Sequence, residues 1–212
     1  MWHLPFSVSD LSKTLLYIHG MGGGVASRIP SILSANMPDI SVVIRTYDFN
    51  PSIAWEQIRS WYDEVHPDIV VGESMGANFA VRLEGVPIVL VSPAFGVPGR
   101  LAALAPAACI PFVAEAAERK YAREGSDGRQ KIHFDPSAMR EWRHFSDLRT
   151  LRTHPFAFFG KQDHYRRSGI VSLRRYEKFF GADSYAEYDG THYMEENFIL
   201  SLLIPKIREV VL

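Results

Sequence analysis

Short hydrophobic runs rich in β-branched and aromatic residues recur along the chain, and segments with helical periodicity lie between them. Runs of this kind, bounded by turn residues, predict buried strands. Strands that alternate with helices predict an α/β protein with a doubly wound, mainly parallel sheet covered on both faces. We expect six strands, at Thr14–Ile18, Ser41–Tyr47, Asp68–Val71, Pro87–Ser92, Pro155–Phe159 and Ser184–Tyr188.

The segments between these strands predict the helices that cover the sheet. A doubly wound sheet with the strand order 2-1-3-4-5-6 is expected, in which the first and third strands are neighbours. Helical patterns lie near Ala26–Ala35, Pro51–Val65, Met75–Leu83, Ser168–Phe180 and Glu195–Leu212.

The connection between the fourth and fifth strands is much longer than the few residues typical of such loops. We interpret residues 94–153 as an insertion that forms a small helical lid, with a helix at Val113–Arg123 and a polar turn at Glu124–Gln130. The alternative is a crossover helix with a long surface loop.

Length and charge limit the classes of protein that remain. A chain of 212 residues is expected to form one domain, 1–212, at roughly 150 residues per domain. The 23 Lys and Arg against 24 Asp and Glu give a formal charge of −1, without a basic run, which argues against nucleic acid as a partner. The oligomeric state stays open.

The cysteine content and the hydrophobic runs bear on location. The single Cys109 cannot form an internal disulfide, and Met1–Lys13 lacks the features of a secretion signal, so we expect a cytoplasmic protein. The most apolar stretch, Gly85–Ala114, contains Arg100 and five prolines, which argues against a membrane span.

The third strand runs directly into Gly72-Glu73-Ser74-Met75-Gly76, a G-x-S-x-G sequence followed by a helical pattern. In this context the two glycines allow a sharp strand-to-helix turn that exposes the serine hydroxyl. The position at a helix N-terminus also supplies free backbone N–H groups for a developing negative charge. Ser74 is therefore a candidate nucleophile.

Two further side chains follow Ser74, first an acid and then a histidine, which is the chain order known for serine nucleophiles on such strand-turn-helix turns. Asp163 comes just after the fifth strand, and His192 just after the sixth. The carboxyl ends of the strands are where α/β proteins bind ligands. Asp147 and Asp189 are weaker candidates for the acid.

A glycine-rich run, His19-Gly20-Met21-Gly22-Gly23-Gly24, ends the first strand and lets the backbone approach a ligand closely at Gly20 and Gly22. It fits neither a Walker loop nor G-x-G-x-x-G. We expect half of an oxyanion hole here, with the Met21 backbone N–H joining that of Met75. His19 is interpreted as ordering the loop rather than as a catalyst.

The remaining polar residues indicate no metal site and no cofactor, because the other histidines lack metal-ligand spacing. The Ala- and Leu-rich start of the insertion suggests an apolar acyl pocket, although the same side chains could pack the lid on the body. Its candidate substrate-binding residues are Phe95 and Leu101, with Leu104, Ile110 and Phe112 beside them.

Y-I-H-G-M-G-G-G, G-E-S-M-G, G-K-Q-D and D-G-T-H, in that order, resemble the serine α/β-hydrolase superfamily over about residues 14–210. The early first strand, the small size and Val91-Ser92-Pro93-Ala94 are similar to its compact bacterial esterase and acyl-thioester hydrolase branch. The chain departs from many relatives at Asp189, where they have glycine, and its loop differs from the H-G-G-G of lipases.

The resemblance implies an α/β-hydrolase fold with Ser74, Asp163 and His192 as a catalytic triad. It also implies that the protein hydrolyses a small-molecule carboxylic ester or thioester through an acyl-enzyme. A peptidase or lactone hydrolase on the same fold, or a non-catalytic binding or scaffold protein, is the alternative.

Overall fold

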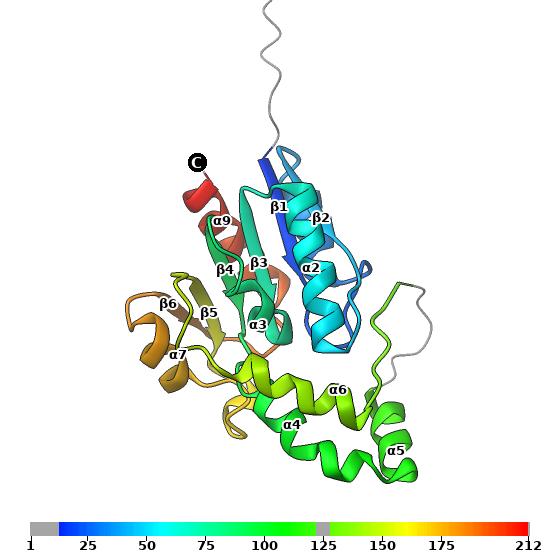
Figure 1. Ribbon diagram of the computed structural model, residues 1–212. Helices are drawn as coiled ribbons and strands as arrows, with labels where there is room; N and C mark the ends of the chain where they lie inside the picture. Colours follow the sequence, from blue (N-terminus) through cyan, green and yellow to red (C-terminus); the bar gives the residue numbers. More distant parts are fainter. Residues whose placement is uncertain (1–12, 122–127, 212) are drawn as a thin grey trace, which may run out of the picture.

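The computed structural model describes residues 13–121 and 128–211 and contains one six-stranded, all-parallel sheet (Figure 1). Its strand order is β2-β1-β3-β4-β5-β6, which confirms the predicted order 2-1-3-4-5-6. The strands lie within a few residues of the predicted positions. They are β1 (Lys13–Ile18), β2 (Ile40–Ile44), β3 (Ile69–Glu73), β4 (Ile88–Val91), β5 (Phe156–Gly160) and β6 (Tyr185–Tyr188).

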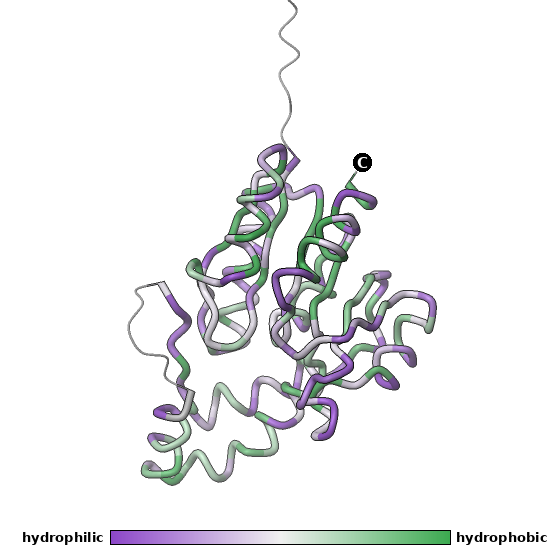
Figure 2. Tube along the Cα trace, turned by 180° about the vertical axis from the view of Figure 1, so that it is seen from behind, coloured by the Kyte–Doolittle hydropathy of each residue, from purple (hydrophilic) through white to green (hydrophobic). Residues whose placement is uncertain are grey.

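Alternate residues of each strand enter two separate hydrophobic cores, one on each face of the sheet. Leu16 packs on the face covered by α2 (Pro51–Val65), α3 (Ala77–Ala80) and α7 (Leu173–Phe180). Its neighbour Leu15 packs on the other face, against α1 (Arg28–Asn36) and α9 (Ile204–Val211). Hydrophobic positions accordingly follow the strands through the interior (Figure 2). Successive side chains of a strand point to opposite faces of the sheet, so a continuous hydrophobic strand contributes to both cores and helices cover both faces.

The long connection between β4 and β5 carries its own helices, as predicted. They are α4 (Val97–Ala108), α5 (Pro111–Tyr121), α6 (Pro136–Glu141) and the 3₁₀ helix η2 (Trp142–Ser146). These helices lie beyond the carboxyl ends of the strands, at the bottom of Figure 1. Part of the insertion belongs to the main core, since Trp142 is fully buried. The predicted turn at Glu124–Gln130 lies partly outside the described residues, and a lid function stays a prediction.

Helix α2 matches its predicted bounds, and the local sequence explains both ends. The Asn50 side chain accepts hydrogen bonds from the backbone N–H groups of Ser52 and Ile53, and Pro51 occupies the first helical position. The helix ends before His66, which adopts a left-handed conformation. Helix α7 starts later than predicted because Gly169 is left-handed, and Ser172 then caps the helix by accepting from Arg175 N–H.

Two predicted helices are interrupted. The segment after Ser74 forms a 3₁₀ turn, η1 (Ser74–Gly76), and then the single turn of α3, instead of one helix to Leu83. The C-terminal helix divides into α8 (Glu196–Phe198), a π-helical turn (Ile199–Leu203) and α9. Pro205, the second residue of α9, has no N–H and crowds the carbonyl four residues earlier, which favours the wider turn before it. No helix in the described ranges has the length and hydropathy needed to cross a membrane.

Candidate active site

The turn between β3 and η1 holds Ser74 in a strained conformation that presents its side chain at the carboxyl edge of the sheet. Ser74 has a φ of 51°, which is uncommon for a residue with a Cβ. Both flanking glycines are required by close packing. A Cβ on Gly72 would lie 2.6 Å from the Ala80 Cβ, and one on Gly76 would lie 2.3 Å from the Ile18 carbonyl oxygen. The packing therefore accounts for the glycines of G-x-S-x-G.

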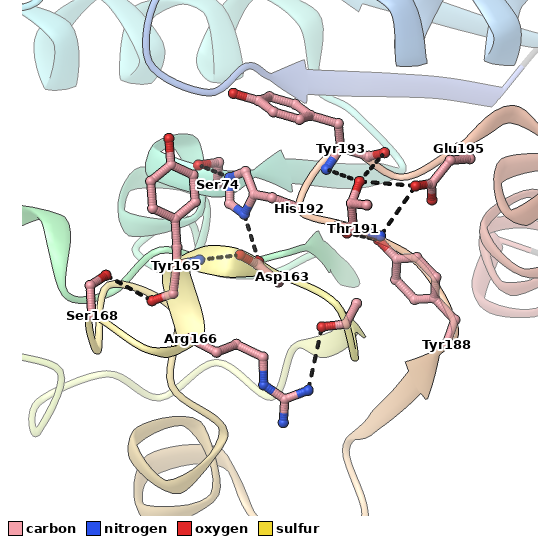
Figure 3. A network of polar contacts seen from close by, with 11 residues as sticks. Ser74, Asp163, Tyr165, Arg166, Ser168, Tyr188, Thr191, His192, Tyr193 and Glu195 are labelled. Carbon is pink, nitrogen blue, oxygen red and sulfur yellow. Dashed lines mark hydrogen bonds and ion pairs between the residues drawn. The ribbon is translucent and has the colours of Figure 1, made fainter.

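His192 and Asp163 meet Ser74 in a continuous hydrogen-bonded chain (Figure 3). The His192 Nδ1 lies 2.7 Å from Asp163 Oδ2, and its Nε2 lies 2.9 Å from Ser74 Oγ. A carboxylate only accepts hydrogen bonds, so Nδ1 carries the proton and Nε2 accepts from the serine hydroxyl. The imidazole is thereby oriented to take the Ser74 proton.

Asp163 is buried and held from a second side. Its exposed fraction is 3%, and its Oδ1 accepts a hydrogen bond of 2.8 Å from the Tyr165 backbone N–H. The Tyr165 ring then packs edge-on against the imidazole of His192, with 4.7 Å between ring centroids. The two other candidate acids lie elsewhere: Asp147 is paired with Arg149, and Asp189 accepts from Gln162 Nε2.

A second network fixes the loop that carries His192. Both the backbone N–H and the hydroxyl of Thr191 donate to Glu195 Oε1, over 3.2 and 2.9 Å (Figure 3). The Tyr188 hydroxyl donates to the Thr191 carbonyl from the end of β6. Thr191 and Glu195 are not among the site residues predicted from the sequence, although T-x-x-x-E immediately before a helix is compatible with such a contact. Thr191, the residue before His192, is therefore held by Glu195 on one side and by Tyr188 on the other.

The glycine-rich loop after β1 lies beside the Ser74 turn because β1 and β3 are neighbours in the sheet. A Cβ on Gly20 would lie 3.1 Å from the Ser74 Cβ. Met21 N–H donates no hydrogen bond within the described part of the chain. Met75 N–H lies in the first turn of η1, where such groups have no intrahelical acceptor. The two predicted oxyanion donors thus border one cavity with Ser74.

His19 is buried and orders this loop. Its Nδ1–H donates to the Gly20 carbonyl over 2.7 Å, and its ring stacks on that of Tyr47 with 4.1 Å between centroids. Burial lowers the pKa of His19 to about 4, so the ring is neutral near pH 7. It does not line the cavity beside Ser74. The structure therefore agrees with the interpretation of His19 as an ordering residue.

The cavity at Ser74 has a volume of about 500 Å³ and mixed walls. Hydrophobic residues line it from several parts of the chain. They are Met21 on the glycine-rich loop, Ala26 and Ile29 around the start of α1, Met75 in η1, Val97 and Ile132 on the insertion, and Ile170 between β5 and α7. Charged and aromatic groups complete the lining, among them Arg28, Glu73, Arg129, Tyr165 and Tyr193. This cavity is the natural place for a small substrate.

The predicted apolar pocket does not form from the residues proposed for it. Phe95 and Leu101 are buried in the core and do not line the cavity, and Phe95 packs against the ring of Tyr176. The neighbouring hydrophobic residues Leu104, Ile110 and Phe112 are exposed. Gly20 lines the cavity as predicted, but Gly22 does not. Its N–H instead donates to the Gln130 side chain.

Similarity to known proteins is found in the structure but not in the sequence. No family model and no curated protein matches the sequence. The structure is similar to Est1E from Butyrivibrio proteoclasticus, solved with ferulic acid, at a TM-score of 0.68 and 14% identity over 99% of this chain and 93% of that one. A monoacylglycerol lipase from Paleococcus ferrophilus has a TM-score of 0.61 at 14% identity, over 93% of each chain.

A third similar structure is FphF, a fluorophosphonate-binding serine hydrolase from Staphylococcus aureus. Its TM-score is 0.57 at 16% identity, over 94% of this chain and 84% of that one. The chain has the α/β-hydrolase fold. Ser74, Asp163 and His192 follow β3, β5 and β6, and serine, acid and histidine is also the chain order in which enzymes of this fold carry a triad. Within residues 13–121 and 128–211, no group of His, Cys, Asp and Glu side chains could hold a metal ion.

Proposed function

We propose that the protein is a serine hydrolase that cleaves a small-molecule carboxylic ester or thioester through an acyl-enzyme intermediate. The observation that carries the proposal is the hydrogen-bonded chain from Asp163 through His192 to Ser74 at the edge of an open cavity. The compact ester and thioester hydrolases are the branch that the sequence resembles. Several proteins of similar structure are named as esterases, lipases or serine hydrolases.

The residues take the following roles in this reaction. His192 Nε2 removes the proton from Ser74 as Oγ attacks the substrate carbonyl carbon, and Asp163 stabilises the imidazolium that forms. The N–H groups of Met21 and Met75 donate to the oxyanion. His192 then protonates the leaving alcohol or thiol. Water attacks the acyl-serine in a second, equivalent cycle, which releases the carboxylic acid and restores Ser74.

The first test is Ser74→Ala in the purified protein, with hydrolysis of 4-nitrophenyl esters and labelling by a fluorophosphonate as readouts. We expect the wild type to be labelled once per chain at Ser74, and the variant to lose on the order of 10⁴-fold or more of the rate. Ser168→Ala is the matched control, because its hydroxyl lies near the site but donates to the Tyr165 carbonyl (Figure 3). Full activity in Ser74→Ala would refute the proposal.

The same experiment separates the alternatives. A non-catalytic binding or scaffold protein stays unlabelled and inert toward all esters. A peptidase or lactone hydrolase is labelled at Ser74 but prefers amide or lactone substrates in a panel of acyl chains and leaving groups. For location, the single Cys109 supports a reducing, cytoplasmic compartment.

A further inference from the structure

Gln130 lies on the insertion, a few residues before α6, and its side chain forms hydrogen bonds with three backbone groups. Its Oε1 accepts from Gly22 N–H over 3.0 Å. Its Nε2 donates to the carbonyl oxygens of Tyr47 and Asp48, over 3.3 and 3.2 Å. An N–H on one side and two carbonyls on the other fix the orientation of the amide. Gln130 is 6% exposed, so water competes little for these bonds.

The backbone around Gln130 is connected to the same loop. Gln130 N–H donates to the Gly23 carbonyl over 2.7 Å, and Val25 N–H donates to the Gly128 carbonyl over 3.3 Å. Gly24 and Arg129 form an isolated antiparallel bridge. Residues 128–130 therefore pair with residues 23–25 as a short antiparallel segment. The Gln130 side chain extends this pairing by one residue, to Gly22.

The position of Gly22 matters because Met21 lies between it and Gly20. On one side, the Gly20 carbonyl accepts from His19 Nδ1 and from Gly23 N–H. On the other side, the Gln130 side chain holds Gly22, which has a left-handed φ of 70°. Glycines sample both signs of φ, so a loop this rich in glycine has little stiffness of its own. The direction of the Met21 N–H depends on these two anchors.

We propose that Gln130 is a positioning residue of the active site, which holds the oxyanion loop so that Met21 N–H points to the developing negative charge. The inference rests on the proposed serine hydrolase function. It also gives the insertion a role in the rate of the reaction in addition to its place in the cavity wall. Gln130 does not line the cavity, and its side chain contacts the glycine-rich loop at Gly22.

The test replaces Gln130 by methionine, which has a similar length but forms none of the three hydrogen bonds. The matched control is Gln57→Met. Gln57 Oε1 accepts from Asp48 N–H over 2.8 Å, so it contacts the same loop as Gln130 but does not reach the glycine-rich loop. Turnover is measured with 4-nitrophenyl acetate and with its thionoester, in which C=S replaces C=O. Sulfur accepts hydrogen bonds weakly, so the thionoester gains little from the oxyanion donors.

We expect Gln130→Met to lower kcat for the ester by roughly 10- to 100-fold with little change in KM, since loss or misplacement of an oxyanion donor acts on the transition state. The rate with the thionoester falls by less than about threefold, and Gln57→Met leaves both rates near those of the wild type. An equal fall for both substrates, or an unchanged ester rate in folded Gln130→Met, overturns the proposal.

Hydrogen exchange of residues 20–24 provides a readout that is independent of activity. The Gly22 amide is expected to exchange faster in Gln130→Met and at the wild-type rate in Gln57→Met. Unchanged exchange in Gln130→Met contradicts the proposed anchor even if activity falls. A wild type that is inert toward esters and fluorophosphonate instead refutes the serine hydrolase function, and the role of Gln130 falls with it.

Discussion

Replacement of Asp163 by asparagine tests the proposed triad at the residue that sets the imidazole tautomer. Asp163 accepts two hydrogen bonds, from Tyr165 N–H and from His192 Nδ1–H. Asparagine has only one oxygen, so one of these donors must face an NH₂ group. The backbone amide of Tyr165 cannot move its proton, whereas imidazole can. We therefore expect the asparagine oxygen to stay with Tyr165, and His192 to shift its proton to Nε2.

This shift removes the base, because Nε2–H then points at Ser74 Oγ, 2.9 Å away, and cannot accept its proton. The same substitution in a protease triad lowers kcat about 10⁴-fold. That factor corresponds to about 5 kcal/mol of activation free energy. We expect a loss of this size here, since Asp163 is only 3% exposed and solvent has little access to its carboxylate.

The assay measures kcat for 4-nitrophenyl acetate and the rate of fluorophosphonate labelling, with thermal unfolding as a check on folding. The controls are Asp189→Asn and Asp147→Asn, which alter the two other acids proposed from the sequence. Asp189 interacts with Gln162, and Asp147 with Arg149. Both variants should stay within about twofold of the wild type, as expected for substitutions outside the site. A folded Asp163→Asn with more than a tenth of the wild-type kcat refutes the assignment, as does a comparable loss in either control.

Gly76→Ala is expected to lower Tm and abolish labelling, because the new Cβ would lie 2.3 Å from the Ile18 carbonyl oxygen. Gly99→Ala in α4 is the control, since a Cβ there has no atom within 4 Å. It should raise the free energy of unfolding, measured in urea, by about 0.5 to 1 kcal/mol. Equal Tm changes would contradict this contrast. His19 has a folded-state pKa of about 4 against 6.5, so between these pH values the unfolded state binds more protons and stability falls as pH falls. Between pH 7 and pH 4, the free energy of unfolding in urea should fall by about 3 kcal/mol more in the wild type than in His19→Phe. The same pH dependence of this free energy in both proteins would contradict the prediction.

The strands and the candidate triad could be predicted because their signals are local. The inner strands β1, β3, β4 and β5 are mostly buried hydrophobic runs, so each can be recognised from its own sequence without knowledge of its neighbours. The G-x-S-x-G motif can be recognised in the sequence because neighbouring atoms lie too close to Gly72 and Gly76 for any other residue to fit. Asp163 and His192 follow the ends of consecutive strands, and parallel strands bring those ends to one edge.

The walls of the cavity could not be predicted in this way. Phe95 and Leu101 are as hydrophobic as Val97 and Ile132, and nothing in the local pattern separates the first pair, which is buried in the core, from the second, which lines the cavity. The difference arises from contacts with distant elements, such as that of Phe95 with Tyr176 of α7. Gln130 carries no signal either, because a glutamine in a polar turn is ordinary and its three partners are 82 to 108 residues away.

The predictable and the unpredictable parts of the site therefore have different origins. The candidate nucleophile, acid and base follow the carboxyl ends of β3, β5 and β6, and the pairing of the strands brings these ends to one edge of the sheet. The insertion supplies Val97, Arg129 and Ile132 to the cavity wall and Gln130 to the glycine-rich loop. Because one segment contributes both, we expect a change in the insertion that alters substrate choice to act also on the loop proposed to stabilise the oxyanion. In the proposed reaction, substrate choice and rate are thus coupled through residues 128–132, whereas the candidate triad is placed by the ends of the strands.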